Sequence, residues 1–527
     1  MKRWLGCAVM ALVVAGCGKG ASKEKGPQPP GGFAGEVLVY ARGADSKKLD
    51  PQAIEDGESV NVVTQIFDTL VAFEAKGTKV EPALATSWTS SPDGMTWTFK
   101  LRTGVKFHDG TAFDAAAVKS NFDRYLQPAH PLRAGLTETP YDFLYKNISK
   151  VETPSGDTVV FTLTEGNATF LTNMAMFPAC ISSPAAIAKH KEAYGQNPVG
   201  TGPFRFVSWE PTQKIVLEAN VEYWGGSPKT KKVIYAVIAE NSVRVQRLRA
   251  GEVHIIDGVP PGELDSIRAD SSCRLLLEPG MNFSYLAINC EKAPFDRPEV
   301  RQAIAMAIDK KELLKLAYRG IGQTGPNALP PTIWGYNDKV ADYPFDPVKA
   351  KAAIAAAGIA GKEIDFYVMP NPRAYVPDPA SVGAVVKQRL EAIGLKPRIV
   401  SPVWEGGVYL GELKQGKHDI ALVGWITDNG DPDNFLFTLF HSTAIPEQNH
   451  AHWKSKAFDT LVVQAQKEPV QAKRAEFYGL AQEVMRGETP VVPLAYLPNI
   501  AAIRANVEGY ALHPMGLVRL KDAFAKK

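Results

Sequence analysis

The sequence predicts an α/β fold with mixed sheets, and three observations lead to that class. The chain has 527 residues, of which 45% are hydrophobic and 22% charged. These are ordinary values for a globular protein with a large apolar core, and the length suggests about three domains. Short apolar strands alternate with amphipathic helices in the second half. Residues 364–400 form one strand–helix–strand unit, whose right-handed crossover predicts parallel strands.

In the first half, apolar spacing and turn residues define five elements. Asp114 is expected to cap one helix, because an aspartate at that position accepts hydrogen bonds from the free N–H groups of the first turn. The predicted elements are strands at residues 37–40 and 158–163, a helix at 60–70, a hairpin from 97 to 107 that turns at 102–104, and the helix after residue 114.

In the second half, proline marks the start and glycine the end of several helices. Proline suits the first helical turn, and glycine suits the left-handed conformation that follows the last one. Gly358 and Gly394 are expected to end two of these helices. The predicted elements are helices at residues 298–318, 347–357 and 381–393, and strands at 364–369, 396–400 and 420–423.

The amino terminus has the pattern of an exported lipoprotein. Two basic residues precede an apolar run at residues 4–14, which is shorter than the roughly 20 residues that span a bilayer. Cys17 follows small residues and resembles the lipidated cysteine of a bacterial lipobox. We expect a signal peptide at residues 1–17 and a flexible linker at 18–35, rich in glycine, lysine, serine and proline. Ordinary secretion with an incidental cysteine is the alternative.

Charge and cysteine content exclude several classes of protein. The net charge is only +3, from 59 basic and 56 acidic residues, which gives no reason to expect a nucleic-acid partner. Besides Cys17 and Cys7 of the signal peptide, the chain contains Cys180, Cys273 and Cys290. Three cysteines cannot all pair within the chain, and no CxxC motif occurs. We expect no disulfide, no bound metal and no cofactor.

Three motifs resemble functional sites without meeting their requirements. The glycines of residues 320–325 match the dinucleotide fingerprint, but that motif must follow a strand, and here it follows a predicted helix. His441, His450 and His452 are close in sequence, and a surface loop explains them better than metal or haem ligation. Residues 428–434 resemble a calcium loop but lack its central glycine and final glutamate, so we expect a hydrogen-bonded turn.

Two charged residues stand out by their position after predicted strands. Arg373 follows the strand that ends at residue 369, and Asp428 follows the strand that ends at residue 423. Open α/β sheets bind ligands beyond the carboxyl ends of their strands. A cation and an anion at such an edge would suit a zwitterion with separated charges. Two charges on solvated loops are the structural alternative.

Several longer motifs resemble one protein family. Residues 96–110, 113–124, 197–204 and 295–303 are similar to the characteristic motifs of the peptide/nickel-type solute-binding proteins of ABC importers, also called family 5. The resemblance extends from about residue 37 to the carboxyl terminus. Two further motifs, at residues 330–338 and 424–434, resemble the dipeptide-binding members of that family.

The resemblance implies a three-lobed fold of the periplasmic-binding-protein type (type II, cluster C), in which a two-strand hinge joins the lobes. One lobe is expected to be assembled from segments far apart in the sequence. The implied boundaries are 36–68, 201–282 and 501–527 for lobe I, 69–200 for lobe II, and 283–500 for lobe III.

The resemblance also implies roles for individual residues. Asp428 would hold the α-amine of a dipeptide and Arg373 its α-carboxylate. The neighbouring contacts would come from Tyr375 and from the backbone of Trp425, Ile426 and Thr427. Glu55 stands where the relatives have a threonine near the ligand. The relatives' disulfide positions read Ala41, Val253, Ser442 and Lys454 here, which agrees with a body free of disulfides.

The resemblance implies a monomeric substrate-binding protein outside the cytoplasm that delivers dipeptides to ABC transporter permease subunits. Together with the lipobox pattern, it predicts a lipoprotein anchored to the membrane through Cys17. It implies no enzymatic activity. Longer oligopeptides, or haem and metal chelates, are the alternative ligands on the same scaffold. A secreted peptidase is a weaker alternative, because no nucleophile–base pair or metal motif is recognisable.

Overall fold

The computed structural model describes residues 33–137, 139–404 and 407–526. The predicted signal peptide, Cys17 and most of the predicted linker lie outside these residues. Among the helices of the described segments, none is long and apolar enough to cross a membrane. The described cysteines, Cys180, Cys273 and Cys290, are free thiols.

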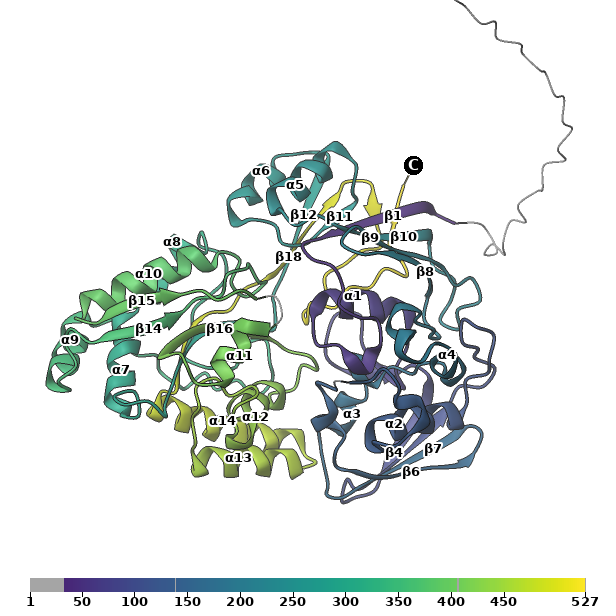
Figure 1. Cartoon of the computed structure of the whole chain (residues 1–527), viewed down its shortest axis with the longest axis horizontal. Coiled ribbons are helices and arrows are strands. Elements are labelled where there is room, and N and C mark those ends of the chain that lie inside the picture. The colour runs from purple at the N-terminus through teal and green to yellow at the C-terminus, as the bar shows by residue number, and fades with distance from the viewer. Residues whose placement is uncertain (1–32, 138, 405–406, 527) are drawn as a thin grey trace, which may run out of the picture.

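Lobe I is built on a seven-stranded mixed sheet whose strands come from three distant segments of the chain (Figure 1). β1 is parallel to β10 and β11, whereas β18 is antiparallel to β11 and β12. In sheet order the strands are β12 (Cys273–Glu278), β18 (Asn499–Arg504), β11 (Ile255–Ile256), β1 (Gly35–Arg42), β10 (Thr230–Val237), β9 (Lys214–Ala219) and β8 (Phe204–Glu210).

Lobe II is built on a four-stranded antiparallel sheet, and helix α2 packs against it. Phe122 of α2 lies edge-on to Phe161, with ring centroids 4.8 Å apart. As predicted, Asp114 caps α2, and its carboxylate accepts a hydrogen bond from the N–H of Ala117 at 2.9 Å. In sheet order the strands are β4 (Ala85–Ser90), β5 (Thr96–Leu101), β7 (Thr158–Leu163) and β6 (Ile148–Ser155), and a separate ribbon is formed by β2 (Val71–Phe73) and β3 (Val80–Pro82).

Lobe III is built on a five-stranded mixed sheet. β14 is parallel to β15 and β16, which confirms the predicted crossover, and β13 is antiparallel to β16 and β17. In sheet order the strands are β15 (Lys396–Val400), β14 (Glu363–Tyr367), β16 (Ile420–Ile426), β13 (Asn282–Ile288) and β17 (Val491–Ala495). A short ribbon near the carboxyl terminus pairs β19 (Val507–Glu508) with β20 (Phe524–Ala525).

The helices cover the faces of these sheets, and each lobe has its own apolar core. The helices of lobes I and II are α1 (Gly57–Ile66), α2 (Ala115–Leu126), α3 (Phe170–Asn173), α4 (Pro184–His190), α5 (Asn241–Ala250) and α6 (Leu264–Arg268). Those of lobe III are α7 (Pro298–Ala307), α8 (Lys310–Ala317), α9 (Pro347–Ala356), α10 (Pro379–Ala392), α11 (Val408–Lys414), α12 (Asp433–Phe440), α13 (Lys456–Lys467) and α14 (Gln471–Glu488). The exact lobe boundaries remain predictions.

Three predicted elements are wrong in detail. The stretch from 97 to 107 is not a hairpin, because β5 pairs with β4 and β7 instead. The predicted helix at 298–318 is two helices, since Asp309 caps the second one by accepting from the N–H of Glu312 at 2.9 Å. The predicted helix at 60–70 ends at Ile66, and Phe67 is already extended.

The chain passes between the sheets of lobes I and III twice, as the predicted two-strand hinge requires. It leaves β12 for β13 through residues 279–281 and returns from β17 to β18 through residues 496–498. The buried amide of Asn282 ties the two passages together: its Nδ2 donates to the carbonyl of Leu497 at 2.9 Å, and its Oδ1 accepts from the N–H of Leu497 at 3.2 Å.

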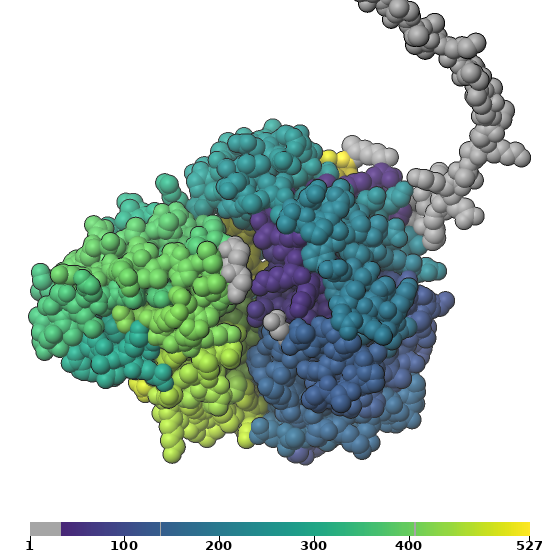
Figure 2. Space-filling model, viewed as in Figure 1, coloured from purple at the N-terminus to yellow at the C-terminus, as the bar shows by residue number. Residues whose placement is uncertain are grey.

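Lobes II and III also touch away from the hinge. The N–H of Ala168 donates to the carbonyl of Gln466 at 2.8 Å, and the buried amides of Asn429 and Asn173 are hydrogen-bonded at 2.9 Å. Lobes II and III are therefore in contact, and Figure 2 shows the blue surface of lobe II against the yellow-green surface of lobe III.

The surface loop expected at His441, His450 and His452 is wrong, because all three side chains are buried. His450 and a further buried histidine, His418, lie beside the amino-terminal end of β16. The Nε2–H of His418 donates to the carbonyl of His450 at 2.8 Å, and the Nδ1 atoms of both residues are buried without a partner. Burial lowers the pKa of each side chain to about 3. An unfolded histidine titrates near 6.5, so the unfolded state takes up protons first as the pH falls. Stability is therefore lost below about pH 6.5.

We predict that each of these histidines costs about 2 kcal/mol of unfolding free energy between pH 7.5 and pH 5. Glutamine at position 418 can keep the hydrogen bond to His450 and cannot be protonated in this range. Urea denaturation of His418→Gln should therefore show a pH dependence smaller than that of the wild type by about this amount. An unchanged difference between the two pH values would contradict the assignment.

Candidate ligand-binding site

The predicted site residues of lobe III lie on two loops that leave the same edge of its sheet. β14 and β16 run parallel, with Tyr367 opposite Ala421, so the loops that follow them emerge side by side. Arg373 and Tyr375 belong to the loop after β14, and Asp428 belongs to the loop after β16.

Tyr375 packs against Gly424 and so connects the two loops. A Cβ atom at position 424 would lie only 2.2 Å from Cδ2 of Tyr375, which means that only glycine leaves room for the ring. The backbones of Arg373 and Val376 exchange hydrogen bonds of 2.9 and 3.0 Å, which close the turn between them. This turn therefore holds Arg373 and Tyr375 beside β16.

The guanidinium of Arg373 lies over the ring of Trp404, 4.0 Å from its centroid. Trp404 in turn stacks on the buried ring of Tyr409, with centroids 5.6 Å apart and planes at 24°. The hydroxyl of Tyr409 donates to the carbonyl of Leu422 in β16 at 2.8 Å. Within the described segments, Arg373 has no carboxylate partner, so its planar set of donors is available to a ligand.

Asp428 is half-buried and is surrounded by neutral groups. Its Oδ2 accepts from the amide of Asn434 at 3.2 Å, and its Oδ1 accepts from the hydroxyl of Tyr141 at 3.5 Å. Burial raises the pKa of the Asp428 carboxyl to about 7, although both hydrogen bonds lower it. Among the described side chains no cation pairs with Asp428, so its charge is fully stabilised only when a cation binds there.

The loop from Asp428 to Asn434 is a hydrogen-bonded turn, as predicted. The side chains of Asn429 and Asp431 each accept from the backbone N–H two residues further on, at 3.0 Å. Asp431 also forms a buried, bidentate pair with Arg474 of α14, with N–O distances of 2.8 and 2.9 Å. The side chains of Asn429 and Asp431 therefore hold the loop itself in place. The described part of the chain contains no group of three metal-ligating side chains.

The predicted backbone contacts are only partly available. Trp425 and Ile426 pair with β13, and the N–H of Thr427 donates to the carbonyl of Met281 in the hinge at 3.0 Å. The indole of Trp425 donates to Asn434 at 2.9 Å. On the other side, β14 pairs with β16 only up to Ala421, so no strand of the described segments lies beside residues 423–426 there. An extended ligand could pair with this free edge.

Glu55 lies just before α1, outside lobe III, and is exposed. No residue of the described segments forms an ion pair with it. Its charge acts on the hydroxyl of Tyr141, whose pKa is raised by burial first and then by the carboxylates of Asp428 and Glu55. Glu55 is therefore near Tyr141, which touches Asp428, but it does not bind Asp428 directly.

Three residues of this site were not found by sequence reasoning. Tyr141 comes from lobe II, and its ring packs against Phe177 with centroids 5.1 Å apart. Trp404 and Asn434 support Arg373 and Asp428 from within lobe III. Aromatic and amide residues are common, and only the folded chain brings these particular ones to the site.

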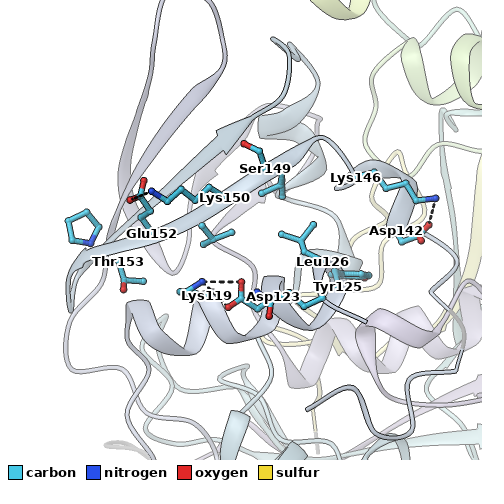
Figure 3. Close-up of a pocket in the computed structure, with 14 residues that line it drawn as sticks. Lys119, Asp123, Tyr125, Leu126, Asp142, Lys146, Ser149, Lys150, Glu152 and Thr153 are labelled. Carbon is cyan, nitrogen blue, oxygen red and sulfur yellow. Dashed lines mark hydrogen bonds and ion pairs between the residues drawn. The ribbon is translucent and has the colours of Figure 1, made fainter. Parts of the chain in front are cut away.

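A separate groove of about 930 Å³ lies between α2 and β6 in lobe II, away from these residues (Figure 3). Its charged side chains pair with one another: Lys119 with Asp123 at 2.8 Å, Lys150 with Glu152 at 2.6 Å, and Lys146 with Asp142 at 3.4 Å. The groove therefore offers no unpaired charge to a ligand. The Arg373–Asp428 region, whose two charges have no oppositely charged partner in the described segments, is therefore the stronger candidate.

Known proteins support the fold and the family. A family model described as "Bacterial extracellular solute-binding proteins, family 5 Middle" matches residues 79–447. The Di/tripeptide-binding protein 1 of Pseudomonas aeruginosa (strain UCBPP-PA14) is 37% identical over 506 residues, which cover 93% of this chain and 94% of that protein. Heme-binding protein A of Haemophilus influenzae is 34% identical over 547 residues, which cover 99% and 98%.

A solved structure extends the likeness to three dimensions. The ABC transporter-associated periplasmic binding protein of Helicobacter pylori in complex with the peptide STSA has a TM-score of 0.83 and 34% sequence identity, and the match covers 94% of this chain and 99% of that one. These relatives are solute-binding proteins and not enzymes, which removes the peptidase alternative. The chain belongs to family 5 of the bacterial extracellular solute-binding proteins.

Proposed function

We propose that this protein is the substrate-binding lipoprotein of an ABC importer, and that it captures dipeptides by their free α-amine and α-carboxylate. The observation that carries the proposal is the placement of Arg373 and Asp428 on adjacent loops, each without an oppositely charged partner in the described segments. The names of the relatives support peptides as the ligand class. A closed, loaded monomer would dock on the permease subunits.

Asp428 is suited to an α-amine because its own partners are neutral. A bound ammonium would supply the positive charge that the site lacks and would lower the pKa of the carboxyl from its value near 7. The proton on Asp428 would then leave as the ligand enters. Binding should accordingly weaken below pH 7, where the ligand has to displace that proton.

Arg373 is suited to a carboxylate because its guanidinium can donate two parallel hydrogen bonds. The ring of Trp404 fixes the plane of the guanidinium, which reduces the side-chain entropy lost on binding. The free edge of β16 at residues 423–426 and the ring of Tyr375 would hold the peptide between its two charged ends. Side chains would then make few obligatory contacts, which favours broad specificity.

Closure of lobes II and III is favoured by contacts that a ligand can make with both lobes only when they are closed. Asp428 belongs to lobe III and Tyr141 to lobe II, and they meet at the site. A ligand held at Asp428 touches both walls, so it favours the closed arrangement by its differential affinity for that state. Closure also excludes water, and each buried terminal charge then needs its fixed partner.

We predict that Arg373→Ala and Asp428→Ala each cost about 2–5 kcal/mol of dipeptide affinity, the range for truncating one partner of a buried charge pair. This corresponds to a loss of roughly 30-fold to several thousandfold. Isothermal titration calorimetry with a dipeptide such as Ala-Phe measures it, and Asp265→Asn, at an exposed position of α6, is the matched control. A loss below threefold for both alanine variants would sink the assignment.

We predict that dipeptides bind at least tenfold more tightly than tripeptides. If both termini are held by residues fixed in lobe III, a third residue moves the carboxylate by about 3.3–3.6 Å. A charge-assisted hydrogen bond of about 2.7–2.9 Å cannot stretch that far. N-acetylation or C-amidation of a dipeptide should abolish measurable binding. Because one relative was solved with the four-residue peptide STSA, tetrapeptides belong in the same titration, and equal affinity for them would refute the length limit.

Haem is a second candidate ligand, favoured by the 34% identity to Heme-binding protein A over nearly the whole chain. The geometry of the site favours peptides. Arg373 and Asp428 offer one positive and one negative group, which match the two termini of a peptide, whereas haem carries two carboxylates. Absorbance of the purified protein after incubation with haemin separates the two, since a Soret band that titrates with one equivalent would favour haem.

We predict that Cys17→Ser prevents membrane anchoring. The expectation comes from the basic, apolar and small-residue pattern that ends at this cysteine, since lipid attachment needs its thiol. Cell fractionation and the size of the processed chain are the measurements. Membrane association and processing identical to those of the wild type would show that Cys17 is not lipidated.

A further inference from the structure

We propose that Asn434 is the positioning residue of the amine site, because its amide occupies one carboxylate oxygen of Asp428 and leaves the other, Oδ1, for the ammonium group of the ligand. This inference rests on the proposed function and deepens it. It names the atom that receives the α-amine and the residue that selects this atom. Asn434 itself acts through Asp428 and does not bind the ligand.

Asn434 is buried in lobe III, and both polar atoms of its side chain are hydrogen-bonded within the site. Its side chain belongs to a residue that is only 2% exposed. Its Oδ1 accepts two hydrogen bonds of 2.9 Å, one from the indole N–H of Trp425 and one from the backbone N–H of Asp428. Its Nδ2 donates to Oδ2 of Asp428 at 3.2 Å. One amide therefore holds both the backbone and the carboxylate of Asp428.

The partners of this amide determine its orientation. The oxygen and the nitrogen of an asparagine side chain have nearly the same shape, and the hydrogen-bond network decides which is which. An indole N–H and a backbone N–H can only donate, so the amide oxygen has to face Trp425 and the backbone of Asp428. The amide NH2 group is thereby directed at the carboxylate. A flipped amide would lose all three hydrogen bonds.

Asn434 is held in place by lobe III alone. It lies in the first turn of α12, and its backbone N–H donates to the carbonyl of Asp431 at 3.1 Å. Asp431 is fixed in turn by its buried pair with Arg474. Trp425 and Asp428 also belong to lobe III. The contact that orients the carboxylate therefore does not depend on closure.

Occupation of Oδ2 leaves Oδ1 as the oxygen for the ligand. Among the described side chains, only the hydroxyl of Tyr141 is hydrogen-bonded to Oδ1 of Asp428, at 3.5 Å. This distance lies at the long end of the range for a hydrogen bond, so the contact is weak. Because Tyr141 comes from lobe II, Oδ1 is the oxygen on the side of that lobe. The α-amine is therefore expected where lobes II and III meet.

The amide of Asn434 also favours the charged form of Asp428. Burial raises the pKa of the Asp428 carboxyl to about 7, and the hydrogen bonds from Asn434 and then from Tyr141 lower it. A neutral carboxyl carries its proton on Oδ1, because Oδ2 already accepts an N–H. An entering ammonium takes that place, and the proton leaves to the solvent. Without Asn434 the pKa would be higher, and the ligand would have to displace the proton over a wider pH range.

Asp433 is a second carboxyl of this loop that titrates near neutral pH. Burial first, and then the carboxylate of Asp431, raise its pKa to about 7. Its own partners are Gln466 and Tyr478, which donate to it at 3.2 and 3.3 Å. These partners remain when Asn434 is changed, so the titration of Asp433 contributes equally to wild type and variant. Glu55 acts on Tyr141 and not on Asp428.

The pH dependence of dipeptide binding tests the positioning role. Calorimetry with Ala-Phe should show a wild-type affinity that weakens below a midpoint near pH 7. Asn434→Leu keeps the approximate size of the side chain but cannot donate a hydrogen bond. We expect a midpoint about one pH unit higher, so that the affinity lost relative to the wild type is about fivefold greater at pH 7 than at pH 9. Deprotonation of the α-amine of the ligand near pH 8 affects both proteins equally.

Asn434→Ala lacks the same donor and provides a second variant should the leucine variant fold poorly. Asn449→Leu is the matched control. Asn449 is also buried and lies at the opposite end of α12, where its amide donates to the carbonyls of Phe440 and Trp453 at 3.1 and 2.9 Å. A purely structural role weakens binding equally at every pH, so this control should keep the wild-type midpoint.

The possible outcomes separate this role from the proposed function. A wild-type midpoint in the variants of Asn434 would overturn the positioning role and leave the proposed function standing. A midpoint raised as much in Asn449→Leu as in Asn434→Leu would also overturn it. Failure of Ala-Phe to bind the wild type at any pH would overturn the proposed function, and the positioning role with it.

Discussion

The arrangement of the site depends on the hydrogen bonds of the hinge. The amide of Asn282 holds the two passages between lobes I and III together through Leu497, and the carbonyl of Met281, one residue earlier, accepts from the N–H of Thr427. Asp428 is the next residue after Thr427. The carboxylate proposed to bind the amine is therefore fixed directly to the hinge between lobes I and III. Because a strand continues from each passage into lobe III, the edge formed by the ends of β14 and β16 keeps one geometry relative to that axis. Arg373, through the contact of its turn with Gly424, belongs to the same rigid unit.

Much of the lobe III half of the site could be predicted from sequence, because it follows from local order. Arg373 and Asp428 come shortly after apolar strands, and strands joined by a crossover end at the same edge of a sheet. The strands of lobe III and the helix caps at Asp114 and Gly394 were likewise predictable from short patterns. The predicted hairpin was wrong because distant pairing decided the outcome: β5 exchanges hydrogen bonds with β7, some sixty residues away, and not with the apolar residues that follow it.

The opposite half of the site could not be predicted, because it exists only through closure. Tyr141 meets Asp428 across 287 positions of sequence, and no periodicity or cap connects the two. Sequence reasoning identified Glu55 only as a departure from relatives. Its relation to Tyr141 requires the folded chain, since Tyr141 comes from a different lobe.

The free edge of β16 at residues 423–426 has a consequence for how a peptide's composition is sensed. Successive side chains of an extended chain point to opposite sides. A two-residue ligand paired with this edge would direct its first side chain to one face of the sheet and its second to the other, so the two positions would hardly influence one another. Preferences at separate, non-touching sites add in free energy. The binding free energies of all four hundred natural dipeptides would then follow from forty values, one for each of the twenty side chains at each of the two positions.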